Sequence, residues 1–413
     1  MTTLVDLPTK LLQKIASSGL GLTDLASLVR TNKRLCRAIT YVLYKSFGSP
    51  LAINFAVKNQ RLDILRIATN FNLDINFRWD EPLRNACSSG YKDIATYLLA
   101  HGARVDPSIV RGGPRDLAES RFSPLDRALW NKHEDIALLL LSRGANPWFT
   151  GFPSDRCPEG HRTALHEATT WGLVRVVEKL VRENMVPIDQ KNQDGHQPLH
   201  VAIMHKVPNT FTKLIELGAD VEVHCGWRHC PLTLALGNYQ YNHAVQLLDA
   251  GANPNPDNVQ PGTCHPIIAC SVAPRKKHRK LAKLQCEIFD IIVKAGAEIN
   301  KVYPNGMTPL SAAVLYGSDY QVAHILSLGA EVDLKERDGF TPLNLLWEMD
   351  WRWKKRKDRN WERVTMLLRA GAELNVEEAR KRVLESVAWS RDCIDPDVRL
   401  RTFIEIAKQH QKP

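Results

Sequence analysis

Two short sequence patterns recur along this chain at a regular spacing, and this repetition limits the folds open to it. The first pattern is a polar residue followed by proline and leucine, as in Thr308-Pro309-Leu310 and Thr341-Pro342-Leu343. The second is a Gly-Ala pair, and many of its copies are about 33 residues apart. The glycines of these pairs are Gly102, Gly144, Gly218, Gly251, Gly296, Gly329 and Gly371. A copied unit of this length indicates stacked structural repeats.

Each pattern marks one end of a predicted helix pair. Ser or Thr before Pro can accept a hydrogen bond from a free backbone N–H at a helix start, and Pro suits the first helical position. A glycine about 20 residues later can take the left-handed conformation that ends a second helix. Between them, small residues such as Ala312 and Ala313 allow close helix packing, while Val322 and Ile325 recur at helical spacing. Turn dipeptides such as Asn305-Gly306 come just before the next pair.

These copies resemble the ankyrin repeat family. The stretch Thr163-Ala164-Leu165-His166-Glu167-Ala168 is close to the family pattern Thr-Pro-Leu-His-x-Ala, and Gln197-Pro198-Leu199-His200-Val201-Ala202 is similar to it. The resemblance implies an all-α ankyrin-repeat solenoid of about nine helix-turn-helix repeats over residues 50–376, whose work is to bind other proteins. It also implies that His166 and His200 form hydrogen bonds between neighbouring repeats.

Several copies depart from the pattern. The first copy, Pro50 to Asn76, and the copy ending near Asn184 lack the Gly-Ala pair. We expect insertions at Ser271–Lys283 and Trp347–Asn360, and long loops at 104–122, 147–160 and 253–264. Residues 377–413 are predicted to form a C-terminal helical cap, with buried side chains at Leu384, Val387, Ala388, Phe403, Ile404 and Ile406.

Residues 1–49 do not follow the repeat and predict three short helices that bury little surface alone. The segment resembles an F-box, although Lys10 replaces an acidic residue and Leu20 is displaced by one position. The matching residues are Leu7, Pro8, Leu11, Leu12, Ile15, Asp24, Leu25, Leu28, Val29 and Leu35. The resemblance implies docking onto a Skp-type adaptor of a cullin (SCF) ubiquitin ligase, through these residues except Asp24. The other interpretation is a polar cap on the first repeat.

These observations predict a non-catalytic protein-protein interaction protein. In the preferred hypothesis it is the substrate-receptor subunit of such a ligase, with the repeats holding an unknown target protein. The alternative hypothesis is a plain ankyrin scaffold without a ubiquitin-ligase link. The chain has no phosphate-binding Gly-Lys-Ser/Thr loop, no His-Glu-x-x-His and no Gly-x-Ser-x-Gly, so we expect neither an enzyme nor a cofactor.

Composition limits the compartment and the partners. The longest strongly apolar run, Ile136–Leu141, is far shorter than the ~20 residues that span a bilayer, and we expect no secretory signal. Nine scattered cysteines fit a reducing compartment, so we expect a cytoplasmic or nuclear protein. The net charge of +10 is concentrated in residues 1–49, 271–283 and 350–363, so we do not expect nucleic acid to bind along the whole chain.

Some residues allow two interpretations. Exposed aromatic and Arg side chains in long loops are typical of partner contacts, although these loops can also fold back over the repeats. The candidates are Trp148, Phe149, Phe152, Trp227 and Arg228. A cluster of tryptophans and basic residues allows two interpretations: a helix pair whose tryptophans pack inward, or a surface that binds nucleic acid or acts as a nuclear import signal. The cluster consists of the tryptophans at 347, 351, 353 and 361 and the basic run 354–357. The basic run 275–283 is read as a solvated insertion or an import signal. We expect no metal site at His224, Cys225, His229, Cys230, Cys264 and His265, because their spacing fits no common zinc finger.

Overall fold

The computed structural model describes residues 50–69, 74–106, 122–148, 163–223, 229–256, 264–272, 279–346 and 357–373. Throughout these ranges the backbone forms helices and turns, with no strand. The chain divides into two compact units, one ending at Gln193 and the other beginning at Asp194. The predicted F-box-like segment and the predicted C-terminal cap lie outside the described residues.

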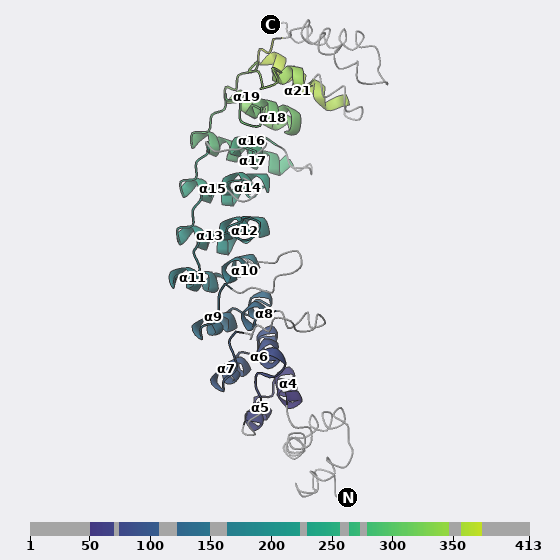
Figure 1. Cartoon of the computed structure of the whole chain (residues 1–413). Coiled ribbons are helices and arrows are strands. Elements are labelled where there is room, and N and C mark those ends of the chain that lie inside the picture. The colour runs from purple at the N-terminus through teal and green to yellow at the C-terminus, as the bar shows by residue number, and fades with distance from the viewer. Residues whose placement is uncertain are drawn as a thin grey trace, which may run out of the picture. The chain divides into compact units, whose positions relative to one another are not determined.

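The first unit contains four helix pairs in its described part (Figure 1). Within each pair the two helices pack on each other, and the first helices also pack on one another in chain order. The second helices α7, α9 and α11 form a parallel row of contacts. The helices are α4 (Pro50–Lys58), α5 (Leu62–Thr69), α6 (Phe77–Ser89), α7 (Lys92–Ala100), α8 (Pro124–Trp130), α9 (Glu134–Ser142), α10 (Ala164–Trp171) and α11 (Val174–Arg182).

The second unit repeats this arrangement with four more described pairs and a further helix that packs on α19 (Figure 1). The first helices α12, α14, α16 and α18 contact one another in order, as do the second helices α13, α15, α17 and α19. The helices are α12 (Pro198–His205), α13 (Pro208–Glu216), α14 (Pro231–Gly237), α15 (Tyr241–Asp249), α16 (Pro266–Ser271), α17 (Arg279–Lys294), α18 (Pro309–Tyr316), α19 (Asp319–Ser327) and α21 (Lys357–Arg369).

The helix starts follow the predicted chemistry. Ser123 caps α8 by accepting from the Asp126 backbone N–H, and the Asp126 carboxylate accepts from the Ser123 N–H in return. Thr308 caps α18 through the same exchange with Ser311. At α14 a thiol performs this role, because Cys230 Sγ accepts from the Thr233 N–H.

The helix ends also follow the pattern, and one departure is explained. The Gly-Ala glycines all have positive φ, such as +86° at Gly144, which ends α9. In one of the two copies that lack this pair, Asn184 has φ +51° at the equivalent place after α11. Asparagine tolerates the left-handed region better than most residues, so this copy keeps the turn without a glycine.

Two helix boundaries differ from the sequence prediction. The stretch Glu81-Pro82-Leu83 is a variant of the Pro-Leu pattern that predicts a helix start, yet Pro82 lies inside α6, which begins at Phe77. Asp80 has φ +65°, so the backbone before Pro82 departs from regular helix and avoids the clash that an interior proline causes. The last five residues of the predicted insertion at Ser271–Lys283 are helical, because α17 begins at Arg279.

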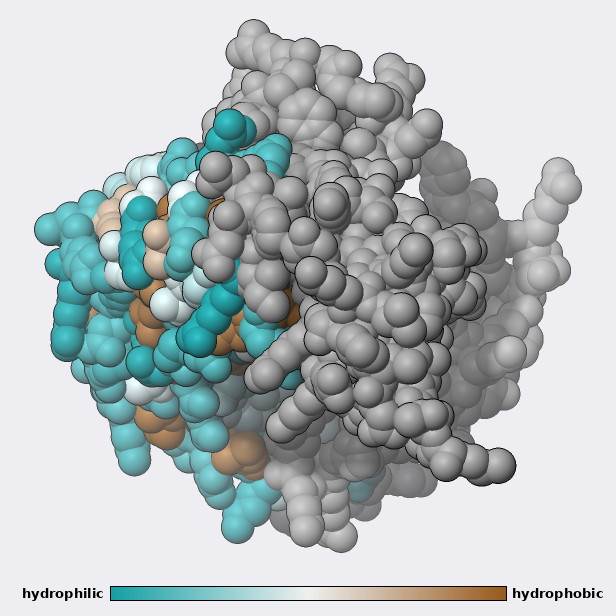
Figure 2. Space-filling view, turned by 90° about the horizontal axis from the view of Figure 1, so that it is seen from below, coloured by the Kyte–Doolittle hydropathy of each residue, from teal (hydrophilic) through white to brown (hydrophobic). Residues whose placement is uncertain are grey.

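The core runs along the stacking direction inside each unit. Fully buried alanines, such as Ala128 in α8 and Ala168 in α10, let neighbouring first helices approach closely, and fully buried leucines such as Leu129 and Leu140 fill the remaining space. Outside the core, the described surface seen in Figure 2 is mostly hydrophilic, with scattered hydrophobic residues. Within the described residues, no helix is long and apolar enough to cross a membrane.

Candidate protein interaction surface

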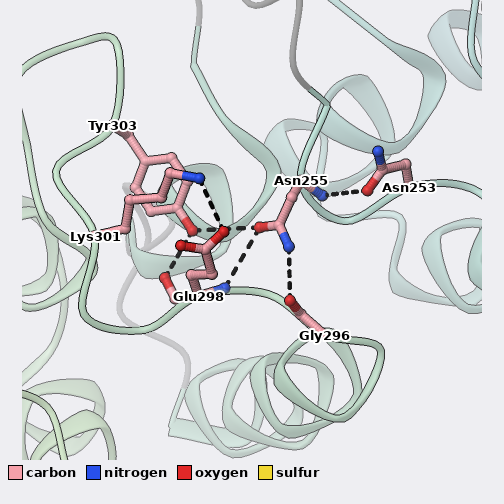
Figure 3. Close-up of polar contacts among 6 residues, drawn as sticks. All are labelled: Asn253, Asn255, Gly296, Glu298, Lys301 and Tyr303. Atoms are coloured by element: carbon pink, nitrogen blue, oxygen red, sulfur yellow. Dashed lines mark hydrogen bonds and ion pairs between the residues drawn. The ribbon is translucent and has the colours of Figure 1, made fainter.

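A polar side chain joins the loop of one repeat to the backbone of the next, and we call each such contact a loop bridge. Figure 3 shows the example at Asn255. Its Nδ2 donates to the Gly296 carbonyl oxygen at 2.6 Å, and its Oδ1 accepts from the Glu298 backbone N–H at 3.4 Å. Tyr303 donates its hydroxyl hydrogen to the Glu298 carbonyl oxygen at 2.7 Å, which holds the receiving loop in place.

The loop bridge recurs at one sequence position in both units. Its side chain is four residues after the glycine of a Gly-Ala pair, or at Asn76 in the first copy, and its partner is two residues after the next such glycine. The bridges are Asn76 to Arg104, Asp106 to Asn146, Glu222 to Asn253, Asn255 to Glu298, Asn300 to Glu331 and Asp333 to Glu373. Asn, Asp and Glu share the oxygen acceptor that this position needs.

A second contact joins the helix ends of neighbouring repeats. His133 Nε2 donates to the Ser88 carbonyl oxygen at 3.1 Å, and Gln240 Nε2 donates to the Ile203 carbonyl oxygen. Each of these donors directly follows a residue in the left-handed conformation at the end of a first helix. The Ser88 carbonyl lies in the last turn of α6, where backbone carbonyls lack partners within the helix, whereas the Ile203 carbonyl also accepts from the Lys206 backbone N–H at 3.2 Å.

The junction between the α8–α9 repeat and the α10–α11 repeat has neither kind of side chain at these positions. Trp148 stands where the other copies carry Asn, Asp or Glu, and its indole N–H can donate but not accept. Leu173 stands where His133 and Gln240 stand, and its side chain cannot form a hydrogen bond. Because it lacks both the loop bridge and the helix-end contact, this junction depends on other contacts.

Two tryptophans and one carboxylate meet at this junction. Trp130, the last residue of α8, donates its indole N–H to Glu167 Oε2 at 3.1 Å. Trp171, the last residue of α10, donates its own indole N–H to the same oxygen at 3.2 Å. Glu167 is only 4% exposed, whereas Trp130 and Trp171 are 39% and 37% exposed. The buried carboxylate therefore fixes two indole rings whose outer parts remain in contact with solvent.

Basic and aromatic side chains extend this group. The Phe122 and Trp130 rings are 4.3 Å apart between centroids, and the Arg127 guanidinium lies 5.3 Å from the centre of the Phe122 ring. Lys132 Nζ lies 5.3 Å from the centre of the Trp171 ring, at the distance of a cation–π contact. We call Phe122, Arg127, Trp130, Lys132 and Trp171 the aromatic patch.

The aromatic patch has the properties of a protein-binding site. Trp and Arg side chains contribute most to binding when they are surrounded by other residues and lose solvent on association. Hydrogen bonds to Glu167 already restrict both indoles, so a partner loses less conformational entropy when it binds them. The patch has no nucleophile–base pair among its five residues, so the chemistry that it supports is binding.

Of the residues that the sequence predicts to bind a partner, only Trp148 lies within the described residues. Trp148 is 46% exposed and follows the turn that Asn146 stabilises by accepting from the Trp148 backbone N–H at 3.0 Å. Phe149, Phe152, Trp227 and Arg228 lie outside the described residues, so their role stays a prediction. The F-box-like residues Leu7, Pro8, Leu11, Leu12, Ile15, Leu25, Leu28, Val29 and Leu35 also lie outside them.

The sequence analysis missed Trp130 and Trp171. The available signal was their place in the repeat: both are the last residue of a first helix, where α6 has Ser89 and α14 has Gly237, although α18 has Tyr316 there. Glu167 gave no such signal, because its role depends on its neighbours.

The histidines and cysteines of interest have structural surroundings. His200 Nε2 donates to the His229 carbonyl oxygen of the next repeat at 3.3 Å, as predicted. His166 Nδ1 lies 2.9 Å from Thr163 Oγ1 at the start of its own helix. Cys230 caps α14, and the His265 ring lies tilted by 35° against the Tyr303 ring, with 4.0 Å between centroids. Within the described residues no three His, Cys, Asp or Glu side chains gather as metal ligands do; His224 and Cys225 lie outside them.

Comparison with known proteins agrees with this geometry. A family model described as "Ankyrin repeats (3 copies)" matches residues 53–150 and 165–258. These two stretches of the chain match ankyrin repeats. Ankyrin repeats bind other proteins, and the pairing of helices and turns described above is the solenoid that this family forms.

The ankyrin repeats are similar to those of several known proteins. An ankyrin repeat protein of fowlpox virus (strain NVSL) is 31% identical over 176 residues, which is 42% of this chain and 36% of the viral protein. Rabankyrin-5 of Mus musculus is 26% identical over 220 residues, which is 51% of this chain and 18% of that protein. The matched region is thus less than half of either relative. The solved ankyrin repeat domain of Bcl-3 aligns with a TM-score of 0.45 and 21% identity, over 59% of this chain and 97% of that domain.

Proposed function

We propose that this chain binds a partner protein through the aromatic patch on α8 and α10. The observation that carries the proposal is the shared carboxylate: Glu167 Oε2 accepts from both Trp130 and Trp171, while both rings stay more than a third exposed. Two exposed indoles held rigid at one repeat junction are costly to keep in water unless they are covered by a partner. Trp148, exposed at the loop of the same repeat, is a further candidate contact.

A pull-down comparison tests this proposal. The full-length chain carrying both Trp130→Ala and Trp171→Ala is used as bait beside the wild type. The matched control carries Tyr316→Ala and Tyr320→Ala, two aromatic residues of the second unit that are 47% and 54% exposed. We expect the tryptophan variant to lose wild-type partners that the tyrosine variant keeps, with both variants folded by circular dichroism. Equal recovery by the two variants contradicts the proposal.

We further propose that the partner bound by the repeats is a ubiquitination target, and that residues 1–49 dock a Skp-type adaptor. This proposal rests on the F-box-like sequence, in particular the Leu7-Pro8 opening and the Asp24-Leu25 step. Holding a target beside a ligase raises the effective concentration of the reacting groups, which needs no catalytic site in this chain. The competing function is a scaffold in which residues 1–49 only cap the repeats.

Separation-of-function variants distinguish these two roles. Leu12→Asp and Leu28→Asp in the full-length chain are expected to abolish recovery of a Skp-type adaptor while partners of the aromatic patch are retained. The variant lacking Trp130 and Trp171 is expected to show the opposite. If no adaptor is recovered by the wild type, or if both leucine variants still bind it, the scaffold function is the better description.

A further inference from the structure

We propose that the partner segment held by the aromatic patch is an acidic peptide, in which an apolar side chain is flanked by Asp or Glu. This inference rests on the proposed function of the patch and adds the chemistry of its occupant. It follows from which charges at the patch face solvent and which are withdrawn from it.

The exposed cation of the patch is Lys132. Its ammonium group lies over the Trp171 ring at 5.3 Å. Arg127 is half-buried, with its guanidinium over the Phe122 ring at 5.3 Å. A cation over an aromatic face keeps its charge and most of its hydration, so it can still attract a carboxylate.

The described carboxylates around the patch are buried or already paired. Glu167 is 4% exposed and accepts from both indoles, and Asp126 is 1% exposed and accepts from Ser123 at the start of α8. On α9, Asp135 accepts from Arg175 at 2.9 Å, and Glu134 accepts from the Arg175 backbone N–H at 2.7 Å.

Among the described residues, the accessible charge next to the exposed rings is therefore positive. A basic partner segment would place a like charge beside Lys132, whereas an acidic one is attracted to it. The rings require an apolar contact as well. When an apolar side chain covers Trp171, the flexible Lys132 side chain can leave the ring and pair with a neighbouring carboxylate of the partner.

Peptide selection tests the inference on the full-length chain. A display library of random-sequence peptides is panned on the wild type, on the Trp130→Ala/Trp171→Ala variant and on Lys132→Glu. We expect enriched peptides to combine an apolar or aromatic residue with Asp or Glu, and to be lost on the tryptophan variant. For a synthetic peptide of this kind, Lys132→Glu is expected to weaken binding about tenfold, and replacing the peptide's acidic residue with Lys is expected to restore it.

Lys206 provides the matched control. It is exposed and has φ +57° at the end of α12, as Lys132 has φ +61° at the end of α8. Lys206→Glu makes the same charge change at the equivalent turn of another repeat and should leave peptide binding unchanged.

The outcomes separate this inference from the proposed function. Enriched peptides that need Trp130 or Trp171 but are neutral or basic overturn the acidic partner and leave the binding function in place. Enriched peptides that bind equally to the tryptophan variant, or no enrichment at all, count against both. If Lys132→Glu and Lys206→Glu weaken peptide binding equally, the proposed contact at Lys132 is wrong, because the change in net charge alone then explains the result.

Discussion

Arg363 of α21 donates from Nε to Asp319 Oδ1 at 2.6 Å, at the start of α19. The rest of the guanidinium donates to the carbonyl oxygens of Val314 and Gly317, which lie at the end of α18. The Arg363 side chain is 11% exposed, so these bonds are made largely away from water. This one arginine provides donors for backbone carbonyls at a helix end that have no partner within the helix. It thereby holds α21 against the preceding repeat.

Replacing this arginine should release α21. Arg363→Ala leaves buried carbonyls without donors and is expected to cost about 2–3 kcal/mol of unfolding free energy. Arg363→Lys should recover only part of this loss, because an ammonium group cannot reproduce the planar set of donors. Hydrogen exchange of the α21 amides and urea unfolding measure the effect. Arg369→Ala, an exposed arginine on the same helix, is the control and should change stability by less than about 0.5 kcal/mol. Equal effects of the two alanine changes would sink this explanation.

The loop bridge at Asn255 has two separable parts. Asn255→Ala removes both the donor to the Gly296 carbonyl and the acceptor for the Glu298 amide, and should lower the free energy of unfolding by about 1–2 kcal/mol. Asn255→Asp keeps the acceptor and loses the donor, so its effect on the Glu298 amide should be smaller. Hydrogen exchange at Glu298 reports the loop itself. Unchanged protection of that amide in the alanine variant would contradict the bridge.

Two glycines should respond in opposite ways to alanine. A Cβ at Gly317 would lie 2.5 Å from the Ala313 carbonyl oxygen and 2.9 Å from that of Ser271, so Gly317→Ala should destabilise the chain by about 1–3 kcal/mol. Gly317 has φ −78°, so the cost is steric crowding and not backbone strain. Gly237 lies within α14 with open space around it, and Gly237→Ala should be neutral or stabilise by up to about 1 kcal/mol. Thermal unfolding of the two variants measures both signs.

The buried His265 makes stability depend on pH. Burial, assisted by the Lys301 charge, lowers the pKa of His265 from 6.5 to about 4. Between these values the unfolded chain binds a proton that the folded chain does not, so stability is lost as pH falls from about 6.5 towards 4. His265→Gln should weaken this dependence, and glutamine already occupies the equivalent position before Pro198. Urea unfolding across this pH range tests it, with the exposed His205→Gln as control; parallel curves for wild type and His265→Gln would refute the assignment.

The predicted features that the structure bears out are those that depend on nearby residues. Ser123 and Asp126 are three residues apart and cap α8 with each other, so the pattern alone was sufficient. The repeat spacing predicts a left-handed residue in the turn after α11, and Asn184 adopts that conformation. Pro82 was misread because the backbone before it, at Asp80, adopts a conformation that no local pattern announced.

The candidate site could not be predicted in the same way. Trp130 and Glu167 are 37 positions apart, and Arg363 and Asp319 are 44 apart. Such pairs meet only when repeats stack in one register and long side chains choose one rotamer, and neither is encoded in a short stretch of sequence. The adaptor-docking role of residues 1–49 and the partner loops beyond Trp148 stay predictions.

By itself, the sequence determined that this protein is built from copied helix pairs, because capping bonds, left-handed turns and the helical spacing of apolar residues act over a few residues. Only the tertiary structure decided which repeat junction presents the aromatic patch and which charges there reach solvent. The reason is that exposure and pairing belong to the packed surface of neighbouring repeats, where one buried carboxylate orients two indole rings from different helices.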